Sequence, residues 1–336
     1  VLGLGDIGPE AGMPVMEGKS LLFKKFGDVD CIPLVVDTKD ADTLINTVKL
    51  LQKNFAGINL EDISSPKCYD IECELKKICD IPVFHDDQHG TAIACLAAVI
   101  GALRFVKKDM KTAKFVVNGC GAAGSAIGRL LISMGAENVT MVDRFGALYE
   151  GIDANLDRIQ SYLATVTNKE HKKGTLADIA KGADVLIGVS APNVFTKEII
   201  ASMADKAIVF ALANPVPETS YADAIEAGAA VAGTGRSDSP NQVNNVTVFP
   251  GVFRGAIDVR AKAITEEMKV AAVYAISELI DEKDLRADYV VPDAFDPRVA
   301  PAVAAAVARV AMETGIARIK VDPEEVRANT MKRVGR

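Results

Sequence analysis

The sequence lacks the features that mark several common classes of protein. Its net charge is −7 and it has no long run of lysine or arginine, which argues against a nucleic-acid-binding surface. None of its six cysteines forms a Cys-x-x-Cys pair, so we interpret them as reduced thiols of a cytoplasmic protein. We find no signal peptide and no apolar run of membrane-spanning length, so we do not expect the protein to associate with a membrane. From the charge, we do not expect a nucleic-acid partner either.

The composition is that of an ordinary globular protein, with 49% hydrophobic and 25% charged residues. A length of 336 residues is sufficient for two domains. The chain opens on Val1 rather than on an initiator methionine, within what resembles a strand and turn. We therefore expect it to be a fragment or a processed form of a longer protein.

Two short apolar stretches each end in a pair of carboxylates. One ends at Glu61 and Asp62, and the other at Asp86 and Asp87. In parallel α/β sheets ligands gather at the carboxyl ends of strands, so both pairs lie where a site is expected. Four carboxylates that converge repel one another unless a cation joins them, and oxygen ligands favour Mg²⁺ or Mn²⁺. Taken alone, each pair is more often a solvated loop or a helix cap.

Strands and helices alternate along the first two thirds of the chain, which predicts an α/β fold with a parallel sheet. The predicted strands cover 31–36, 57–60, 81–84, 114–118, 138–143, 183–190, 207–215 and 229–236. The predicted helices cover 20–26, 40–55, 66–79, 91–106, 125–134, 255–263, 265–280 and 301–314.

A glycine motif indicates a dinucleotide site. Gly119, Gly121 and Gly124 have Gly-x-Gly-x-x-Gly spacing, follow one predicted strand and open a helix, and Asp143 ends the next strand. In this context the second glycine lets the backbone approach a pyrophosphate at the helix N-terminus, and Asp143 binds the adenosine ribose. A carboxylate there favours NAD, whereas the neighbouring Arg144 leaves NADP open.

Lys19 and two asparagines are candidates for which spacing alone is a weak guide. Lys19 lies where a glycine-rich segment meets a helix; this favours a solvated lysine, with a general base as the functional alternative. Asn214 ends a predicted strand, and Asn245 closes an amide-rich loop. Amides suit a carboxylate substrate, although polar surface turns have the same composition.

Taken together, these residues resemble the prokaryotic-type malic enzymes over essentially the whole chain and in family order. The motifs that carry the resemblance are Val1-Leu2-Gly3-Leu4-Gly5-Asp6-Ile7-Gly8, Val15-Met16-Glu17-Gly18-Lys19, Ile58-Asn59-Leu60-Glu61-Asp62-Ile63, Phe84-His85-Asp86-Asp87-Gln88-His89-Gly90-Thr91-Ala92, Phe210-Ala211-Leu212-Ala213-Asn214-Pro215, Gly235-Arg236-Ser237-Asp238 and Pro240-Asn241-Gln242-Val243-Asn244-Asn245.

The resemblance implies oxidative decarboxylation of L-malate to pyruvate and CO₂, with NAD(P)⁺ and Mg²⁺ or Mn²⁺. It implies that Glu61, Asp62 and Asp87 are metal ligands. It also implies that Lys19 is the general base with Asp86 beside it, and that Asn214 and Asn245 hold the substrate carboxylate. The candidate cofactor-binding residues are Thr91, Gly119, Gly121, Ala122, Ala123, Gly124, Asp143, Arg144, Ser190 and Asn214.

The family further implies a Rossmann-type dinucleotide domain, here 86–245, and a discontinuous metal and substrate domain, here 1–85 and 246–336, with the site in the cleft between them. Homodimers or larger assemblies are usual in the family. Its catalytic tyrosine belongs to a Tyr-Thr-Pro-Gly-like segment that these residues do not contain, so we expect this chain alone to be impaired in turnover. A malolactic enzyme and a non-catalytic dinucleotide-binding protein are the alternatives.

Overall fold

The computed structural model describes residues 4–335 and divides into two compact units. Unit 1 comprises Val1–Gly90, Asn245–Leu279 and Phe295–Arg336, and unit 2 comprises Thr91–Asn244 and Ile280–Ala294. Ile280–Ala294 thus belongs to unit 2 although it follows a segment of unit 1 in the chain. The functional domain limits given above stay a prediction.

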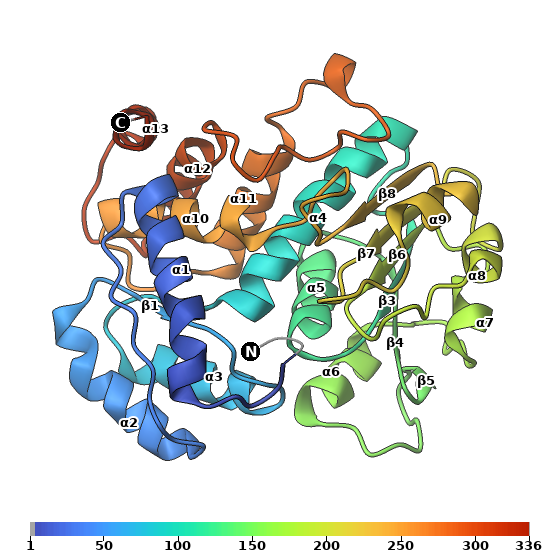
Figure 1. Cartoon of the computed structure of the whole chain (residues 1–336), viewed down its shortest axis with the longest axis horizontal. Coiled ribbons are helices and arrows are strands. Elements are labelled where there is room, and N and C mark those ends of the chain that lie inside the picture. The colour runs from blue at the N-terminus through green and yellow to red at the C-terminus, as the bar shows by residue number, and fades with distance from the viewer. Residues whose placement is uncertain (1–3, 336) are drawn as a thin grey trace. The chain divides into compact units, whose positions relative to one another are not determined.

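Unit 2 is built on a six-stranded sheet in the order β5-β4-β3-β6-β7-β8 (Figure 1). All neighbours are parallel except β5, which pairs antiparallel with β4. The strands are β3 (Lys114–Asn118), β4 (Asn138–Asp143), β5 (Gly146–Ala147), β6 (Val185–Gly188), β7 (Ile208–Ala211) and β8 (Val231–Thr234). Runs of buried valine, isoleucine and phenylalanine are typical of parallel strands covered on both faces. The predicted α/β fold is confirmed.

Five helices of unit 2 lie between these strands in sequence. They are α5 (Ala122–Ser133), α6 (Arg158–Val166), α7 (Leu176–Ala180), α8 (Lys197–Ala201) and α9 (Tyr221–Glu226), and the 3₁₀ helix η3 (Glu282–Asp284) follows the last strand. Sequence periodicity predicted only the first of these. The others are short, and α6, α8 and α9 begin at side-chain caps such as Asp157, which accepts hydrogen bonds from the backbone of Ile159 and Gln160.

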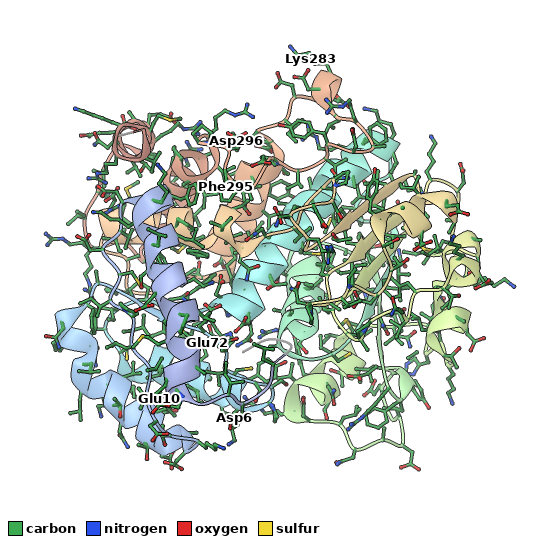
Figure 2. The ribbon with its side chains drawn as sticks, in the orientation of Figure 1. Asp6, Glu10, Glu72, Lys283, Phe295 and Asp296 are labelled. Carbon is green, nitrogen blue, oxygen red and sulfur yellow. The ribbon has the colours of Figure 1, made fainter. Side chains whose placement is uncertain are left out.

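Unit 1 contains a two-stranded parallel sheet of β1 (Ile58–Leu60) and β2 (Val83–His85). Its first helices are α1 (Pro9–Gly27), α2 (Ala41–Leu51) and α3 (Lys67–Ile78), with the 3₁₀ helix η1 at Gln52–Asn54. Leu60, Ile71, Leu75 and Val83 form a small core between the sheet and α3. Glu72, labelled in Figure 2, is a buried carboxylate on the same helix.

The C-terminal part of unit 1 is helical. It comprises η2 (Asn245–Thr247), α10 (Phe249–Asp258), α11 (Glu266–Ser277), α12 (Val299–Glu313) and α13 (Pro323–Val334). The alanine-rich α12 packs against the other three α-helices of this segment, which lie around it in Figure 1. Small side chains allow this close approach. The predicted start at 255 was wrong, because α10 begins at Phe249, and α13 was not predicted.

The predicted strand at 31–36 was wrong, because this segment has no regular structure. Its apolar side chains have no covering layer: Ile32 is 63% exposed and Leu34 is 50% exposed. Helix α1 also begins at Pro9 rather than at 20, although glycine and proline in its first turns lower helix propensity.

Helix α4 (Asp86–Val106) corrects two further expectations. It starts at Asp86, directly after β2, rather than at residue 91 as predicted, so Asp86 and Asp87 lie in its first turn. By length and composition it is apolar enough to cross a membrane, contrary to the sequence analysis. However, 83% of its most apolar window is buried inside the protein, as in the core helix of a soluble fold.

Candidate active site

The Lys19 ammonium occupies the centre of a buried charged cluster in unit 1. Its Nζ lies 2.5 Å from Asp86 Oδ2 and 3.0 Å from Glu61 Oε2, and 4.3 Å from the centre of the Phe249 ring. The Lys19 side chain is only 13% exposed, so the solvated surface lysine that spacing favoured is wrong. The cluster joins α1, the segment after β1 and the first turn of α4.

The protonation of this cluster is set by burial and by its neighbours. Burial alone would lower the pKa of Lys19, but the Asp86 and Glu61 carboxylates outweigh it and raise that pKa above its ordinary value. Burial, together with Asp86, raises the pKa of Glu61 well above its ordinary value despite Lys19. Burial raises the pKa of Asp87, and Asp86 adds to this effect. One ammonium therefore leaves the carboxylates incompletely compensated.

Asp62 and Asp87 are joined through the backbone. The Asp62 N–H donates to Asp87 Oδ2 at 2.8 Å, and Asp62 has a φ of 57°, in the left-handed region. Such a conformation costs on the order of 1 kcal/mol for a residue other than glycine, and it recurs at functional sites. The segment after β1 therefore turns sharply toward the first turn of α4.

Among residues 4–335, no three His, Cys, Asp or Glu side chains are arranged so that they could hold a metal ion. The Lys19 ammonium instead bridges Glu61 and Asp86. The donor chemistry nevertheless fits Mg²⁺ or Mn²⁺, because Asp86 and Asp87 are buried, Glu61 and Asp62 are partly buried, and these carboxylates are incompletely compensated. Within residues 4–335, Asp86 Oδ1 is a buried oxygen with no hydrogen-bond partner.

Asn245 and Gly90 hold Asp86 in place. Asn245 Nδ2 donates to Asp86 Oδ2 at 3.0 Å, so this amide nitrogen contacts the acid that pairs with Lys19. A Cβ at position 90 would lie 1.9 Å from Asp86 Oδ1. Glycine at the fifth position of α4 is therefore required for this carboxylate orientation.

Sequence reasoning missed His85 and Phe249. His85 ends β2 and is fully buried, and neither of its ring nitrogens has a hydrogen-bond partner. Its proximity opposes the rise in the pKa of Asp87. Phe249 begins α10 and covers the Lys19 ammonium. His85 could have been found from the sequence, because it directly precedes Asp86 and Asp87.

The predicted dinucleotide cradle lies in unit 2 between β3 and α5. Gly119 has a φ of 108°, and a Cβ there would lie 2.5 Å from the carbonyl oxygen of Val189. The space beside Gly121 is open to 4 Å, and Ala122 and Ala123 are the partly exposed first residues of α5. Gly124 packs closely against Gly119, because a Cβ at position 124 would lie 1.8 Å from the carbonyl oxygen of Gly119. An open helix N-terminus of this kind binds phosphate.

Asp143 ends β4, and Arg144 follows it directly. Asp143 Oδ1 accepts a hydrogen bond from the Arg144 N–H at 2.7 Å, and Oδ2 accepts one from Gln160 Nε2 at 3.0 Å. The Arg144 guanidinium lies 4.8 Å from the centre of the Phe145 ring. Gln160 was not predicted, although the Asp157-x-x-Gln160 capping box of α6 is a recognisable signature.

The carboxyl ends of β6 and β7 are joined by Glu218, which sequence reasoning missed. Its carboxylate accepts from the N–H and hydroxyl of Ser190 at 2.7 and 3.1 Å and from the Ala213 N–H at 3.0 Å. Asn118 Nδ2 also donates to Ser190 at 2.7 Å. Burial raises the pKa of Glu218. Asn214 follows on the exposed side beside Gly235, and Thr91 lies in the second turn of α4.

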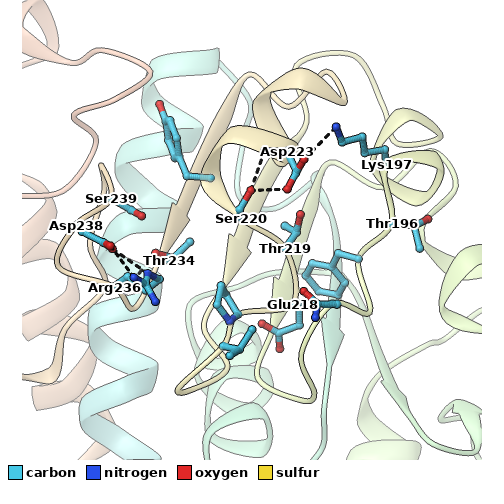
Figure 3. Close-up of a pocket in the computed structure, with 15 residues that line it drawn as sticks. Thr196, Lys197, Glu218, Thr219, Ser220, Asp223, Thr234, Arg236, Asp238 and Ser239 are labelled. Carbon is cyan, nitrogen blue, oxygen red and sulfur yellow. Dashed lines mark hydrogen bonds and ion pairs between the residues drawn. The ribbon is translucent and has the colours of Figure 1, made fainter.

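A cavity of about 510 Å³ lies beside Glu218 in unit 2 (Figure 3). Its two basic side chains are both paired: Arg236 contacts Asp238 at 2.6 Å, and Lys197 contacts Asp223 at 3.0 Å. None of the predicted site residues lines it. We therefore do not assign it to the predicted site.

Two family models match the chain. The NAD-binding domain of malic enzyme matches residues 88–312, and the N-terminal domain of malic enzyme matches residues 1–44. A crystal structure of malic enzyme from Pyrococcus horikoshii superposes with a TM-score of 0.96 at 43% identity, covering 100% of this chain and 79% of that one.

Curated relatives agree with these matches. The chain is 57% identical over 332 residues to the bifunctional malic/malolactic enzyme of Bacillus subtilis, covering 99% of this chain and 81% of that protein. It is 50% identical to the NAD-dependent malic enzyme of Geobacillus stearothermophilus and 46% identical to the NADP-dependent malic enzyme of Escherichia coli, covering 95% and 94% of this chain. It spans 66% and 44% of the lengths of those two proteins. The chain belongs to the malic enzyme family, whose members couple the oxidative decarboxylation of malate to the reduction of NAD(P)⁺.

Proposed function

We propose that this chain oxidises and decarboxylates L-malate with Lys19 as the general base. The observation that carries this proposal is the buried cluster in which Lys19 contacts Glu61 and Asp86, with Asn245 on the same Asp86 oxygen. A base must take the proton of the C2 hydroxyl as hydride leaves C2 for the nicotinamide ring. A lysine held by two carboxylates is oriented for that task.

Lys19 must lose its own proton before it can act as a base. In the arrangement described, Asp86 and Glu61 raise its pKa and hold it as an ammonium. If Glu61 held a cation, it would stabilise the Lys19 ammonium less, and the pKa of Lys19 would fall. Asp86, the closer of the two carboxylates at 2.5 Å, then remains as the group that orients the free amine.

Glu61, Asp62 and Asp87 are the residues that would hold Mg²⁺ or Mn²⁺. When bound, such an ion supplies Lewis-acid polarisation of the C2 oxygen, which stabilises the enolate left when CO₂ departs. Asn214 and Asn245 supply amide donors for the substrate carboxylate. In the structure the Asn245 amide nitrogen already donates to Asp86, so we propose that it contacts acid and substrate together.

For the cofactor we propose a preference for NAD⁺. Asp143 is fixed by Gln160 and by the Arg144 backbone, and a fixed carboxylate repels a 2′-phosphate. The relatives include NAD- and NADP-dependent enzymes at similar identity, so the preference depends on this local geometry. We further propose a cytoplasmic homodimer or larger assembly, as is usual in the family.

A second product is supported by one observation. The Bacillus subtilis relative, 57% identical, is described as a bifunctional malic/malolactic enzyme. Release of lactate needs the same C2 oxidation and decarboxylation, followed by return of the hydride to the ketone. Chromatography of the products distinguishes the two: pyruvate with stoichiometric NAD(P)H supports the malic reaction, and lactate without net NAD(P)H supports the malolactic one.

Asp87→Ala tests the metal assignment. We expect it to abolish metal-dependent NAD(P)H formation from L-malate and to leave NADH binding, measured by fluorescence, unchanged, because the cradle belongs to unit 2. Asp37→Ala, which removes an exposed carboxylate from unit 1, is the control and should retain activity. Unchanged turnover of Asp87→Ala at saturating Mn²⁺ would contradict the assignment.

A further inference from the structure

The first turn of α4 needs support that its backbone does not provide. It follows β2 without a loop, and within residues 4–335 β2 pairs with only one neighbouring strand, β1. Residues 86–89 are all buried, with between 0% and 8% of each residue exposed. Because this turn carries Asp86 and Asp87, a small rotation of the helix moves both carboxylates.

One buried glutamate from α3 contacts two consecutive side chains of this turn. Glu72 Oε1 lies 2.7 Å from His89 Nε2, and Glu72 Oε2 accepts from Gln88 Nε2 at 3.2 Å. Glu72 is 6% exposed, and its pKa stays far below the ordinary value because His89 and Lys76 outweigh the effect of burial. Both oxygens of a single carboxylate therefore hold the turn.

A buried lysine from α11 holds the other side of His89. Lys269 Nζ lies 3.1 Å from His89 Nδ1, and it is also paired with Glu266. An ammonium has no acceptor, so Nδ1 accepts and the imidazole proton is on Nε2, where it is donated to Glu72. Two ion pairs flank the neutral imidazole. Glu72 pairs with Lys76 at 2.7 Å, and Lys269 pairs with Glu266.

We propose that Glu72 and Lys269 are positioning residues for the metal-binding turn. They fix the rotation of His89 and Gln88, and with it the directions of Asp86 and Asp87 in the same turn. This inference rests on the proposed role of Asp87 as a metal ligand. Partners of this kind, outside the ligands themselves, change metal affinity by about 10- to 100-fold when they are removed.

The test is Mn²⁺ binding to Glu72→Gln and Lys269→Met, measured by electron paramagnetic resonance of free Mn²⁺, with NADH binding measured in parallel. We expect the Mn²⁺ Kd to rise about tenfold or more in both variants and the NADH Kd to stay unchanged. Lys269→Arg keeps a donor for His89 and should restore Mn²⁺ affinity to within about threefold. A purely structural role would lower the melting temperature without changing the Mn²⁺ Kd of the folded protein.

Two further variants make the outcomes distinguishable. Asp258→Asn breaks the partly buried Arg254–Asp258 pair on α10 in the same unit and should lower stability without weakening Mn²⁺ binding. Asp87→Ala should abolish Mn²⁺ binding. If Asp87→Ala still binds Mn²⁺ normally, the metal assignment itself fails. If Asp87→Ala fails to bind but Glu72→Gln and Lys269→Met bind as the wild type does, only the positioning inference is overturned. If Glu72→Gln does not fold, the Mn²⁺ Kd values of Lys269→Met and Lys269→Arg test the positioning inference.

Discussion

At the scale of single residues, Lys19 illustrates why local patterns were insufficient. Its spacing within a helix is that of many solvated lysines. Its environment comes from Asp86, 67 positions away along the chain, and that acid is held in turn by Asn245, 159 positions further on. No periodicity within a window of one helix contains these separations. The resemblance of long motifs to a known family identified the residue, and the fold supplies the physical reason for its burial.

Gly90→Ala tests whether the orientation of Asp86 matters. A Cβ at position 90 would lie 1.9 Å from a carboxylate oxygen of Asp86, which can rotate away, so we expect a strong loss of kcat with little change in melting temperature. Gly101→Ala in the same helix is the matched control. Its Cβ would lie 1.8 Å from the backbone oxygen of Val290, which cannot rotate, so stability should fall instead. Full activity of Gly90→Ala would show that this orientation is not required.

At the scale of elements, the sheet of unit 2 was predictable and the acidic turn was not. Buried runs such as Val185–Gly188 and Ile208–Ala211 have the composition of central parallel strands, and the structure confirms them. In contrast, Asp86 and Asp87 were expected at the end of a strand, and the next helix was expected to begin only at residue 91. The alanine-rich sequence that follows favours a helix. Carboxylates are favourable in the first turn of a helix, so α4 can begin immediately at Asp86.

The contact between α6 and the end of β4 leads to a prediction on cofactor choice. Gln160 holds Asp143 Oδ2 at 3.0 Å, so Gln160→Ala should free this carboxylate and reduce the preference for NAD⁺ over NADP⁺. Asp143→Ser, which removes the repulsion altogether, should reduce it further. The ratio of kcat/KM for the two cofactors is the measurement. An unchanged ratio in both variants would contradict the proposed role of Asp143.

The packing of α3, α4 and α11 around His89 predicts a dependence of stability on pH. Burial, with the Lys269 ammonium adding to it, lowers the pKa of His89 from 6.5 to about 3. The unfolded chain therefore binds one more proton than the folded chain between these values, so stability is present above pH 6.5 and is lost as the pH falls toward 3. One pH unit below 6.5, the loss from this residue is about 1.4 kcal/mol.

Urea unfolding as a function of pH checks this dependence. His89→Gln should remove the corresponding slope, whereas His171→Gln, at an exposed position, should leave it in place. The same slope in wild type and His89→Gln would show that the imidazole is not held neutral in the folded protein.

At the scale of the whole chain, the two units carry separate parts of the proposed chemistry. Unit 1 contains Lys19, the acidic pairs and Asn245, and unit 2 contains the glycine cradle, Asp143, Ser190 and Asn214. The contributions of Ile280–Ala294 and of α13 were not predictable, because neither carries a motif and both depend on packing. The expectation that this chain alone turns over slowly stays a prediction.

The most direct test of the account is the first turnover of L-malate, followed by stopped-flow absorbance of NAD(P)H with Mn²⁺ and with NAD⁺ or NADP⁺ in excess over enzyme. Hydride transfer precedes tautomerisation of the product, so this step does not depend on the family's tyrosine segment. We predict a metal-dependent burst in this chain that falls by about 10²- to 10⁴-fold in Lys19→Met while NADH binding is retained. A burst of wild-type rate in Lys19→Met would contradict the central claim that Lys19 is the base.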